Sequence, residues 1–211
     1  MDVTVVTGIF DIDRSYYGNN KRSIEHYIRC FINLLRIPAP CVIFCEYKFI
    51  LIVDRIRRQI PFKTTIIPVC ISSLISYQPE LSSYKILETS KIDLLYQSTI
   101  YSNTNYYLWL NSEYSFNTID FSNIKLNSSH YPQNKLSLIK AKNTDLKHET
   151  LYTGFLFLSK EIVRKIHILY YNLIVNNNIS NTCTYYLLST KNPEYINLIC
   201  NITNPIFDII T

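Results

Sequence analysis

The stretch VTVVTGIFDIDRS, residues 3–15, constrains the fold of this chain more than any other segment. Its first four residues, VTVV, form a β-branched apolar run that predicts a buried strand. The run leads into Gly8, where glycine permits a tight turn of the backbone. A strand followed at once by a turn and charged side chains is how open α/β sheets form a ligand crevice at the carboxyl ends of their strands. The charged residues here are Asp11, Asp13 and Arg14.

The following residues complete a strand–helix–strand unit. Ser23 is a predicted N-cap, and apolar residues recur after it at helical spacing. Pro38 and Pro40 end this helix, and CVIFC at 41–45 predicts a second buried strand. The apolar positions of the helix are Ile24, Tyr27, Ile28, Phe31, Leu34 and Leu35.

The remainder of the chain continues the alternation of strands and helices, which predicts an α/β sheet in a single domain over residues 1–211. Residues 111–150 are polar and predict loops with short elements. A helix is expected to begin at the N-cap Ser90, and a long one to run from the N-cap Ser159 to Val175. The other predicted elements are a short helix at 49–56, strands at 64–70, 106–110 and 154–158, and two short final helices at 182–190 and 193–200.

Four blocks of the chain, in order, resemble the HtrL/YibB (WlaTC-like) family, whose members are regarded as glycosyltransferases of the GT-A type. The first is VTGIFDIDRS with the following KRS tract, helix and VIFCE. The others are SKIDLLYQSTIYSNTNYYLWLNSE at 90–113, YTGFLFLSKEIVRKIHILYYNLI at 152–174 and NPEYINLI at 192–199. The resemblance implies a GT-A-like (Rossmann-like), mostly parallel sheet flanked by helices, which binds a nucleotide-sugar.

Composition excludes several other classes of function. The chain has only 3 Gly, and neither GxGxxG nor GxxxxGK[ST] is present, so a glycine-rich phosphate loop is not expected. A net charge of +5 without a dense basic stripe argues against nucleic acid as a partner. The cluster of Arg55, Arg57 and Arg58 predicts a solvated face, with attraction of a phosphorylated substrate or an anionic membrane as the alternative.

Composition also gives expectations about location and source. The 6 Cys form no CxxC pair, and no basic segment precedes the first strand, which predicts a reducing cytoplasmic compartment. No apolar run approaches the roughly 20 residues of a membrane span. The many Asn, Ile and Tyr residues have A/T-rich codons and suggest a bacterium or a large DNA virus, in which case the compartment is the host cytoplasm.

The candidate metal site follows the strand at 106–110. Sugar transfer from a nucleotide donor requires neutralisation of the leaving diphosphate, and a divalent cation held by carboxylates does this in GT-A enzymes. The resemblance implies a metal-facing Asp at position 111, where this chain has Asn111, and Glu113 can supply a carboxylate. We therefore expect Mn²⁺ or Mg²⁺ at Asn111 and Glu113; a plain polar turn is the alternative.

The candidate nucleotide-sugar site combines two segments. Lys91 is expected in the first turn of its helix, where the helix dipole favours an anion such as the diphosphate. The backbone of Thr7, Gly8 and Ile9 is expected to border the base. Asp11 would accept from the base or ribose, and Arg14 would reach a phosphate. Solvated charges are the alternative in each case.

The catalytic residues are unknown from the sequence, with His148 and Glu149 as candidates for an acid/base pair. The predicted function is metal-assisted transfer of a sugar from a nucleotide-sugar donor to a hydroxyl of a glycan, lipid or protein acceptor. The first alternative is a catalytically degraded GT-A-like binding or assembly protein, whose metal motif is eroded to Asn-Ser-Glu and which has lost acidic groups at 181–184. The second is a nucleotide-binding enzyme of another class, such as a nucleotidyltransferase.

Overall fold

The computed structural model describes residues 2–12, 23–74, 76, 79–112, 121–124, 126, 128, 131–140, 151–177, 188 and 190–199. These residues form a seven-stranded sheet in the order β3-β2-β1-β4-β6-β5-β7. Strands β3, β2, β1 and β4 are parallel, whereas β6 is antiparallel to both β4 and β5. The strands are β1 (Val3–Ile9), β2 (Cys41–Cys45), β3 (Thr64–Pro68), β4 (Tyr106–Leu110), β5 (Leu136–Lys140), β6 (Leu151–Ser159) and β7 (Ile196–Ile199).

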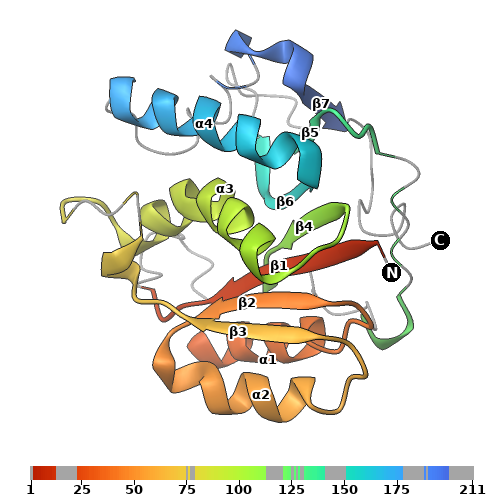
Figure 1. Cartoon of the computed structure of the whole chain (residues 1–211). Helices are drawn as coiled ribbons and strands as arrows, with labels where there is room; N and C mark the ends of the chain where they lie inside the picture. The colour runs from red at the N-terminus through yellow and green to blue at the C-terminus, as the bar shows by residue number, and fades with distance from the viewer. Residues whose placement is uncertain are drawn as a thin grey trace.

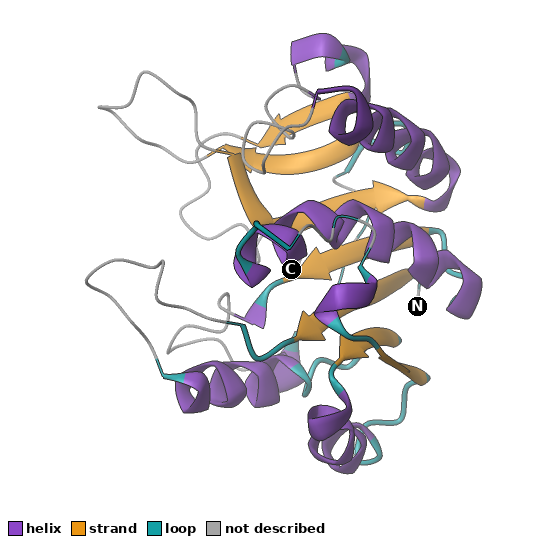
Figure 2. Cartoon of the chain, turned by 90° about the vertical axis from the view of Figure 1, so that its left-hand side faces the viewer, coloured by secondary structure: helices purple, strands orange, loops and turns teal. Residues whose placement is uncertain are grey.

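Helices cover both faces of the sheet (Figures 1 and 2). Helices α1 (Ile24–Leu34) and α2 (Ile50–Arg57) pack on the face that presents Val3, Val5 and Ile9 of β1. Helices α3 (Ser83–Tyr101) and α4 (Lys160–Asn177) pack on the opposite face, against side chains such as Val6 and Trp109. Because side chains alternate along a strand, β1, β2, β4 and β6 each contribute to both cores. This explains why the strands of the parallel part are continuous apolar runs.

Most elements predicted from the sequence are present in the structure. Strands β2 and β4 have the predicted bounds, and β1, β3 and β6 lie at the predicted places. Ser23 is the N-cap of α1, where its side chain accepts a hydrogen bond from the backbone N–H of His26. The apolar segment at 49–56 is helical, as predicted, and the long helix α4 begins directly after Ser159.

Two predicted elements are wrong. Helix α3 begins after the N-cap Ser82, so Ser90 is inside the helix. The Ser90 hydroxyl donates back to the carbonyl of Ile86 rather than capping a helix end. The final segment predicted as a helix is instead a short 3₁₀ turn, Pro193–Tyr195, followed by β7. Pairing of β7 with β5 overrides the local pattern, since four residues gain a ladder of backbone hydrogen bonds on the edge of the sheet.

Arg57 is not part of a solvated basic face. Arg57 is only 3% exposed, and its guanidinium donates hydrogen bonds to the carbonyls of Leu35, Ile37 and Ala39 at 2.8–2.9 Å. Its Nε also donates to the Thr64 hydroxyl at 2.9 Å. Arg57 thus ties α2 to the turn between α1 and β2 and to the start of β3. The planar array of donors in arginine suits this role, and it leaves Arg57 unavailable to a ligand.

Candidate functional site

The candidate site lies between the neighbouring strands β1 and β4, where the strand order of the sheet changes direction. From β1 the chain adds β2 and β3 on one side, and then crosses through α3 to add β4 on the other side of β1. In open α/β sheets, such a switch point in the strand order leaves a crevice outside the carboxyl ends of the two strands. Ligands of open α/β sheets bind in this crevice.

A pocket occupies this position. Strand β1 and the residues after it contribute Gly8, Ile9, Phe10 and Ile12, and β4 and its end contribute Trp109, Asn111 and Ser112. The helices contribute Tyr27 from α1 and Tyr84, Leu87 and Glu88 from α3. The lining is therefore aromatic, with a few polar groups, as is typical of small-molecule sites. Its free volume of about 40 Å³ is less than a nucleotide needs, so the pocket is at most one subsite.

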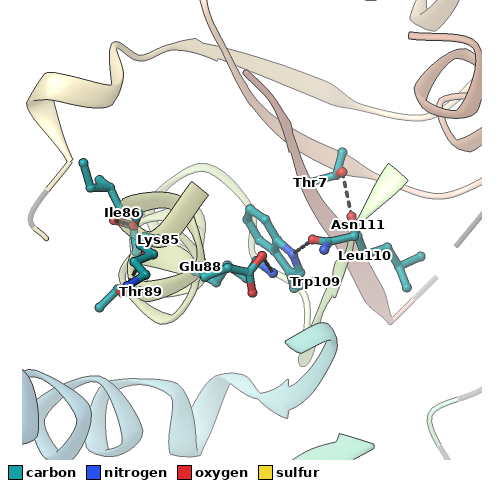
Figure 3. Close-up of polar contacts among 10 residues, drawn as sticks. Thr7, Lys85, Ile86, Glu88, Thr89, Trp109, Leu110 and Asn111 are labelled. Carbon is teal, nitrogen blue, oxygen red and sulfur yellow. Dashed lines mark hydrogen bonds and ion pairs between the residues drawn. The ribbon is translucent and has the colours of Figure 1, made fainter. Parts of the chain in front are cut away.

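Gly8 is required by close packing at the floor of this pocket. A Cβ added at Gly8 would lie 2.7 Å from Cε2 of Phe10 and 3.1 Å from the carbonyl oxygen of Phe44. The phenyl ring can shift, but the backbone of β2 cannot do so without distorting the sheet. The neighbouring Thr7 is buried, and its hydroxyl donates to the carbonyl of Leu110 at 2.7 Å, which joins the end of β1 to the end of β4 (Figure 3). Thr7 therefore holds the crevice together and does not face a ligand through its side chain.

Asn111 follows β4 and lines the pocket. The indole Nε1 of Trp109 donates to Oδ1 of Asn111 at 2.7 Å (Figure 3). Trp109 is 1% exposed and packs against α3. The buried ring thus fixes the position of the Asn111 side chain at the mouth of the crevice.

Lys91 does not lie in a first helical turn, so that part of the prediction is wrong. It is in the middle of α3, its side chain is fully buried, and its Nζ forms an ion pair of 2.5 Å with Oε1 of Glu88. The same Nζ lies 5.9 Å from the centre of the Trp109 ring, within the range of a cation–π interaction. The i, i+3 spacing on α3 brings the two charges together. Lys91 thus acts on the pocket through Glu88 and Trp109.

Asp11 lies outside the pocket lining. Its carboxylate forms an ion pair of 2.5 Å with Nζ of Lys48, and its backbone N–H donates to Oε2 of Glu46 at 3.1 Å. The hydrogen bond to Asp11 raises the pKa of Lys48. Both partners come from the residues after β2, so these contacts tie the end of β1 to the neighbouring strand. About half of each side chain in the Asp11–Lys48 pair is exposed, so a ligand can still reach them.

The described residues do not fit a divalent cation. Asn111 turns its oxygen toward Trp109, and Glu88, which lines the pocket, already faces Lys91. Within the described ranges, no three His, Cys, Asp or Glu side chains come together as a metal-binding group. A hard cation such as Mg²⁺ requires oxygen ligands, and usually carboxylates. Glu113 lies outside the described residues, so the Asn111–Glu113 metal site stays a prediction for which this part of the chain offers no support.

The structure brings together only some of the predicted site residues. Gly8, Ile9 and Asn111 line the same pocket, and Lys91 lies behind it. The predictions about Arg14, His148, Glu149 and residues 181–184 concern positions outside the described residues. Four further residues line the pocket without having been predicted from the sequence: Tyr27, Tyr84, Glu88 and Trp109. Glu88 could have been found from its i, i+3 spacing to Lys91, but only after extending the helix back to Ser83.

A larger cavity lies at the opposite edge of the same strands. Its volume is about 640 Å³, and its lining includes Asp2 before β1, Asn105 before β4, and Lys160 and Glu161 at the start of α4. These are the amino ends of parallel strands, where open α/β sheets do not place their ligands. Substitutions in this cavity, called the control cavity below, should therefore leave the candidate site unaffected. No helix in the described part of the chain is long and apolar enough to cross a membrane.

Comparison with known proteins confirms the resemblance to the HtrL/YibB family that was noted in the sequence. Residues 1–103 match the model of a family described as "Bacterial protein of unknown function (HtrL_YibB)". The match ends just after α3 and so includes β1, β2, β3 and the residues Glu88 and Lys91. No curated protein sequence matches the chain.

Solved structures confirm the predicted GT-A-like fold. The 4-diphosphocytidyl-2C-methyl-D-erythritol synthase of Anaerococcus prevotii DSM 20548 superposes with a TM-score of 0.53 at 8% identity, covering 96% of this chain and 88% of that one. A glycosyltransferase involved in the glycosylation of the major capsid of PBCV-1 superposes with a TM-score of 0.50 at 13% identity, covering 95% and 81%. At these identities the similarity is one of fold.

Proposed function

We propose that this protein is a nucleotide-sugar-dependent glycosyltransferase whose donor binds at the carboxyl ends of β1 and β4. The observation that carries the proposal is the aromatic and polar pocket at the switch point of a GT-A-like sheet. Tyr84, which is partly exposed, offers aromatic surface to a base or sugar ring, and Glu88 can accept a hydrogen bond from a ring N–H or hydroxyl. A carboxylate has about four acceptor positions, so this contact is compatible with the Lys91 pair.

In the proposed reaction, an acceptor hydroxyl attacks the anomeric carbon of the donor sugar. The new carbon–oxygen bond forms as the bond to the nucleoside diphosphate breaks, and the diphosphate leaves with the bonding electron pair. The acceptor proton passes to a general base, for which His148 and Glu149 remain the candidates. In this reaction, the described residues of the pocket bind and orient the donor ring.

Two other functions remain as alternatives. The fold similarity includes a synthase that is not named as a glycosyltransferase, so a nucleotidyltransferase reaction is the rival within the class of enzymes. A binding protein with the same fold but an eroded metal motif is the rival outside it, and the orientation of Asn111 is the observation that favours this rival. A nucleotidyltransferase would form a different product from a glycosyltransferase, and a binding protein would form no product.

A ligand screen followed by a matched pair of variants tests the proposal. UDP-, GDP- and TDP-sugars are screened by thermal shift, since a ligand that binds only the folded state raises the unfolding temperature. For the best donor, Tyr84→Leu should weaken binding roughly tenfold, because loss of an aromatic stacking surface costs about 1–3 kcal/mol. Glu161→Gln, at the control cavity, should leave binding unchanged. Absence of any nucleotide-sugar effect, or equal effects of both variants, would contradict the proposal.

A further inference from the structure

The Trp109 indole decides which way the Asn111 amide faces. Oxygen and nitrogen of an asparagine amide are normally assigned only from the surrounding hydrogen-bond network. Here the partner is an indole N–H, which can donate but cannot accept. The atom 2.7 Å from Nε1 must therefore be the carbonyl oxygen of Asn111, as Figure 3 shows.

This orientation turns the Asn111 NH₂ group away from Trp109. The indole cannot easily move to release the oxygen, because Trp109 is 1% exposed and belongs to the core beneath α3 and α4. Asn111 itself lines the pocket. The group that it offers to a ligand is thus a pair of N–H donors, which attract an oxygen atom with lone pairs and repel a cation.

The electrostatics of the pocket agree with this. Glu88 contributes a carboxylate to the lining, but the Lys91 ammonium at 2.5 Å balances its charge. Both side chains are at least nine-tenths buried, so water screens this pair weakly. A second cation placed here would face Lys91 without an added carboxylate among the described lining residues.

We infer that the end of β4 binds an oxygen atom of the donor through the Asn111 amide N–H groups, in place of a divalent cation. The ligand oxygen belongs to a nucleotide-sugar, a part of the inference that rests on the proposed function. The orientation of the amide and the missing cation do not depend on it. Metal binding and nucleotide binding can therefore be tested separately.

The first experiment measures metal binding alone, without nucleotide. The full-length protein is titrated with Mn²⁺, and free Mn²⁺ is followed by electron paramagnetic resonance. The native protein should show no stoichiometric binding below about 1 mM, the weak end of protein sites for such hard cations. Asn111→Asp should bind at least about tenfold more tightly, because one carboxylate oxygen accepts from Trp109 while the other faces the pocket. Stoichiometric Mn²⁺ binding by the native protein, whether or not Asn111→Ala abolishes it, would overturn the inference.

The second experiment measures nucleotide-sugar binding through the single Trp of the chain. Trp109 fluorescence gives the dissociation constant, which should be the same in EDTA and in Mg²⁺. Asn111→Ala should weaken binding about 5–10-fold, the equivalent of one hydrogen bond, while Asn105→Ala at the control cavity should not. A Mg²⁺ requirement in the native protein would overturn the inference. If no nucleotide-sugar binds at all, the proposed function fails, and the Mn²⁺ titration still decides the metal question.

A nuclear magnetic resonance spectrum checks that the variants remain folded and that the hydrogen bond exists. One indole N–H signal is expected from the only Trp. It should move upfield in Asn111→Ala, where the acceptor is lost, and downfield in Asn111→Asp, where a charged acceptor strengthens the bond. An unchanged indole signal in both variants would overturn the amide orientation on which the inference stands.

Discussion

Two buried basic residues, Arg57 and Lys91, lie in different regions and are satisfied in different ways. Arg57, at the corner of α2 and β3, donates to neutral carbonyl groups of a turn and to one hydroxyl. Lys91, within α3, faces the carboxylate of Glu88 and the ring of Trp109. Arg57 therefore holds backbone segments in place. The Lys91 region instead sets the charge of the pocket, because both of its partners line it.

The comparison shows that a buried cation in an α/β sheet is not by itself a sign of a phosphate site. Both residues were candidates for contact with an anionic ligand in the sequence. The structure commits each to internal partners, since a buried charge is tolerated only when it is paired or fully hydrogen-bonded. What separates them is the distance of their partners from the ligand crevice. Stability and ligand affinity should therefore respond differently in the two regions.

The largest expected effect is the loss of stability in Arg57→Met. Removal of the guanidinium leaves the carbonyls of Leu35, Ile37 and Ala39 buried without these donors, which should cost about 4 kcal/mol of unfolding free energy. Urea unfolding followed by circular dichroism measures this. Arg58→Met is the matched control, since its ion pair with Asp54 is exposed and should contribute less than about 1 kcal/mol. Equal losses in the two variants would contradict the structural role of Arg57.

Lys91→Met should cost somewhat less, about 3 kcal/mol, because it leaves the buried Glu88 carboxylate without its cation. The double variant Lys91→Met with Glu88→Leu removes both charges and should recover most of this loss. Unfolding free energies of the native protein, both single variants and the double variant form the cycle. A double variant as unstable as the sum of the singles would show that the pair is not coupled.

Nucleotide-sugar affinity should change in a variant of the Lys91 region but not in a variant of the Arg57 region. Lys91→Met should weaken the best nucleotide-sugar about fivefold, because loss of the cation disturbs both Glu88 and Trp109 at the pocket, and a fivefold change is about 1 kcal/mol. Arg57→Met, measured at a temperature where it is folded, should bind normally. Titration by tryptophan fluorescence gives both constants. Weaker binding in Arg57→Met than in Lys91→Met would reverse the comparison.

The stability of the protein should depend on pH through Cys41, which lies near Arg57. Burial raises the pKa of the Cys41 thiol from its ordinary value of 9.0 to about 11, while the nearby Arg57 opposes the rise. Between these pH values, the unfolded chain releases a proton that the folded protein keeps, so stability present below pH 9 falls as the pH approaches 11. Cys41→Ala should show a shallower decline of the unfolding midpoint over this range. An identical decline would exclude Cys41 as its source.

The smallest effect is expected at Asp11. Its ion pair with Lys48 is half exposed, so Asp11→Asn should leave the urea midpoint nearly unchanged. The informative readout is nucleotide-sugar affinity, which should fall only if the ligand extends from the pocket to this pair, as the sequence predicted. A change in stability as large as that of Arg57→Met would show that this exposed pair holds the two strands together.

The sequence predicted the parallel part of the sheet well. The β-branched and apolar runs of β1, β2 and β4 can be buried only as strands covered on both faces, and Pro38 and Ser23 mark the ends of the helix between them. Asn111 was correctly placed after the carboxyl end of β4, whereas Gly8, expected in a tight turn after the first strand, lies inside β1 and pairs with Phe44 of β2. Strand β7 was misread as a helix, because its apolar run is too short to reveal its period.

The site was less predictable from the sequence than the fold. Around Lys91, local signals favoured a helix start at Ser90, because serine is a common N-cap and polar residues precede it. The true start at Ser83 changes the neighbours of Lys91 from solvent to Glu88 and Trp109. The earlier start adds Glu88 to the helix one turn before Lys91, and local sequence does not fix where the helix begins.

The sequence by itself determined the class of fold, the order of the first strands and the edge of the sheet where polar residues gather, since these depend on local patterns of hydrophobicity and turn residues. Only the tertiary structure decided what each polar group does there. The partner of Asn111 is two residues away and that of Lys91 is three residues away, but it is the packing of α3 against β4 that buries both pairs at the pocket. Arg57 binds a turn whose carbonyl groups lie about 20 residues away in the sequence. Burial then forces each polar atom to take the partner that packing provides.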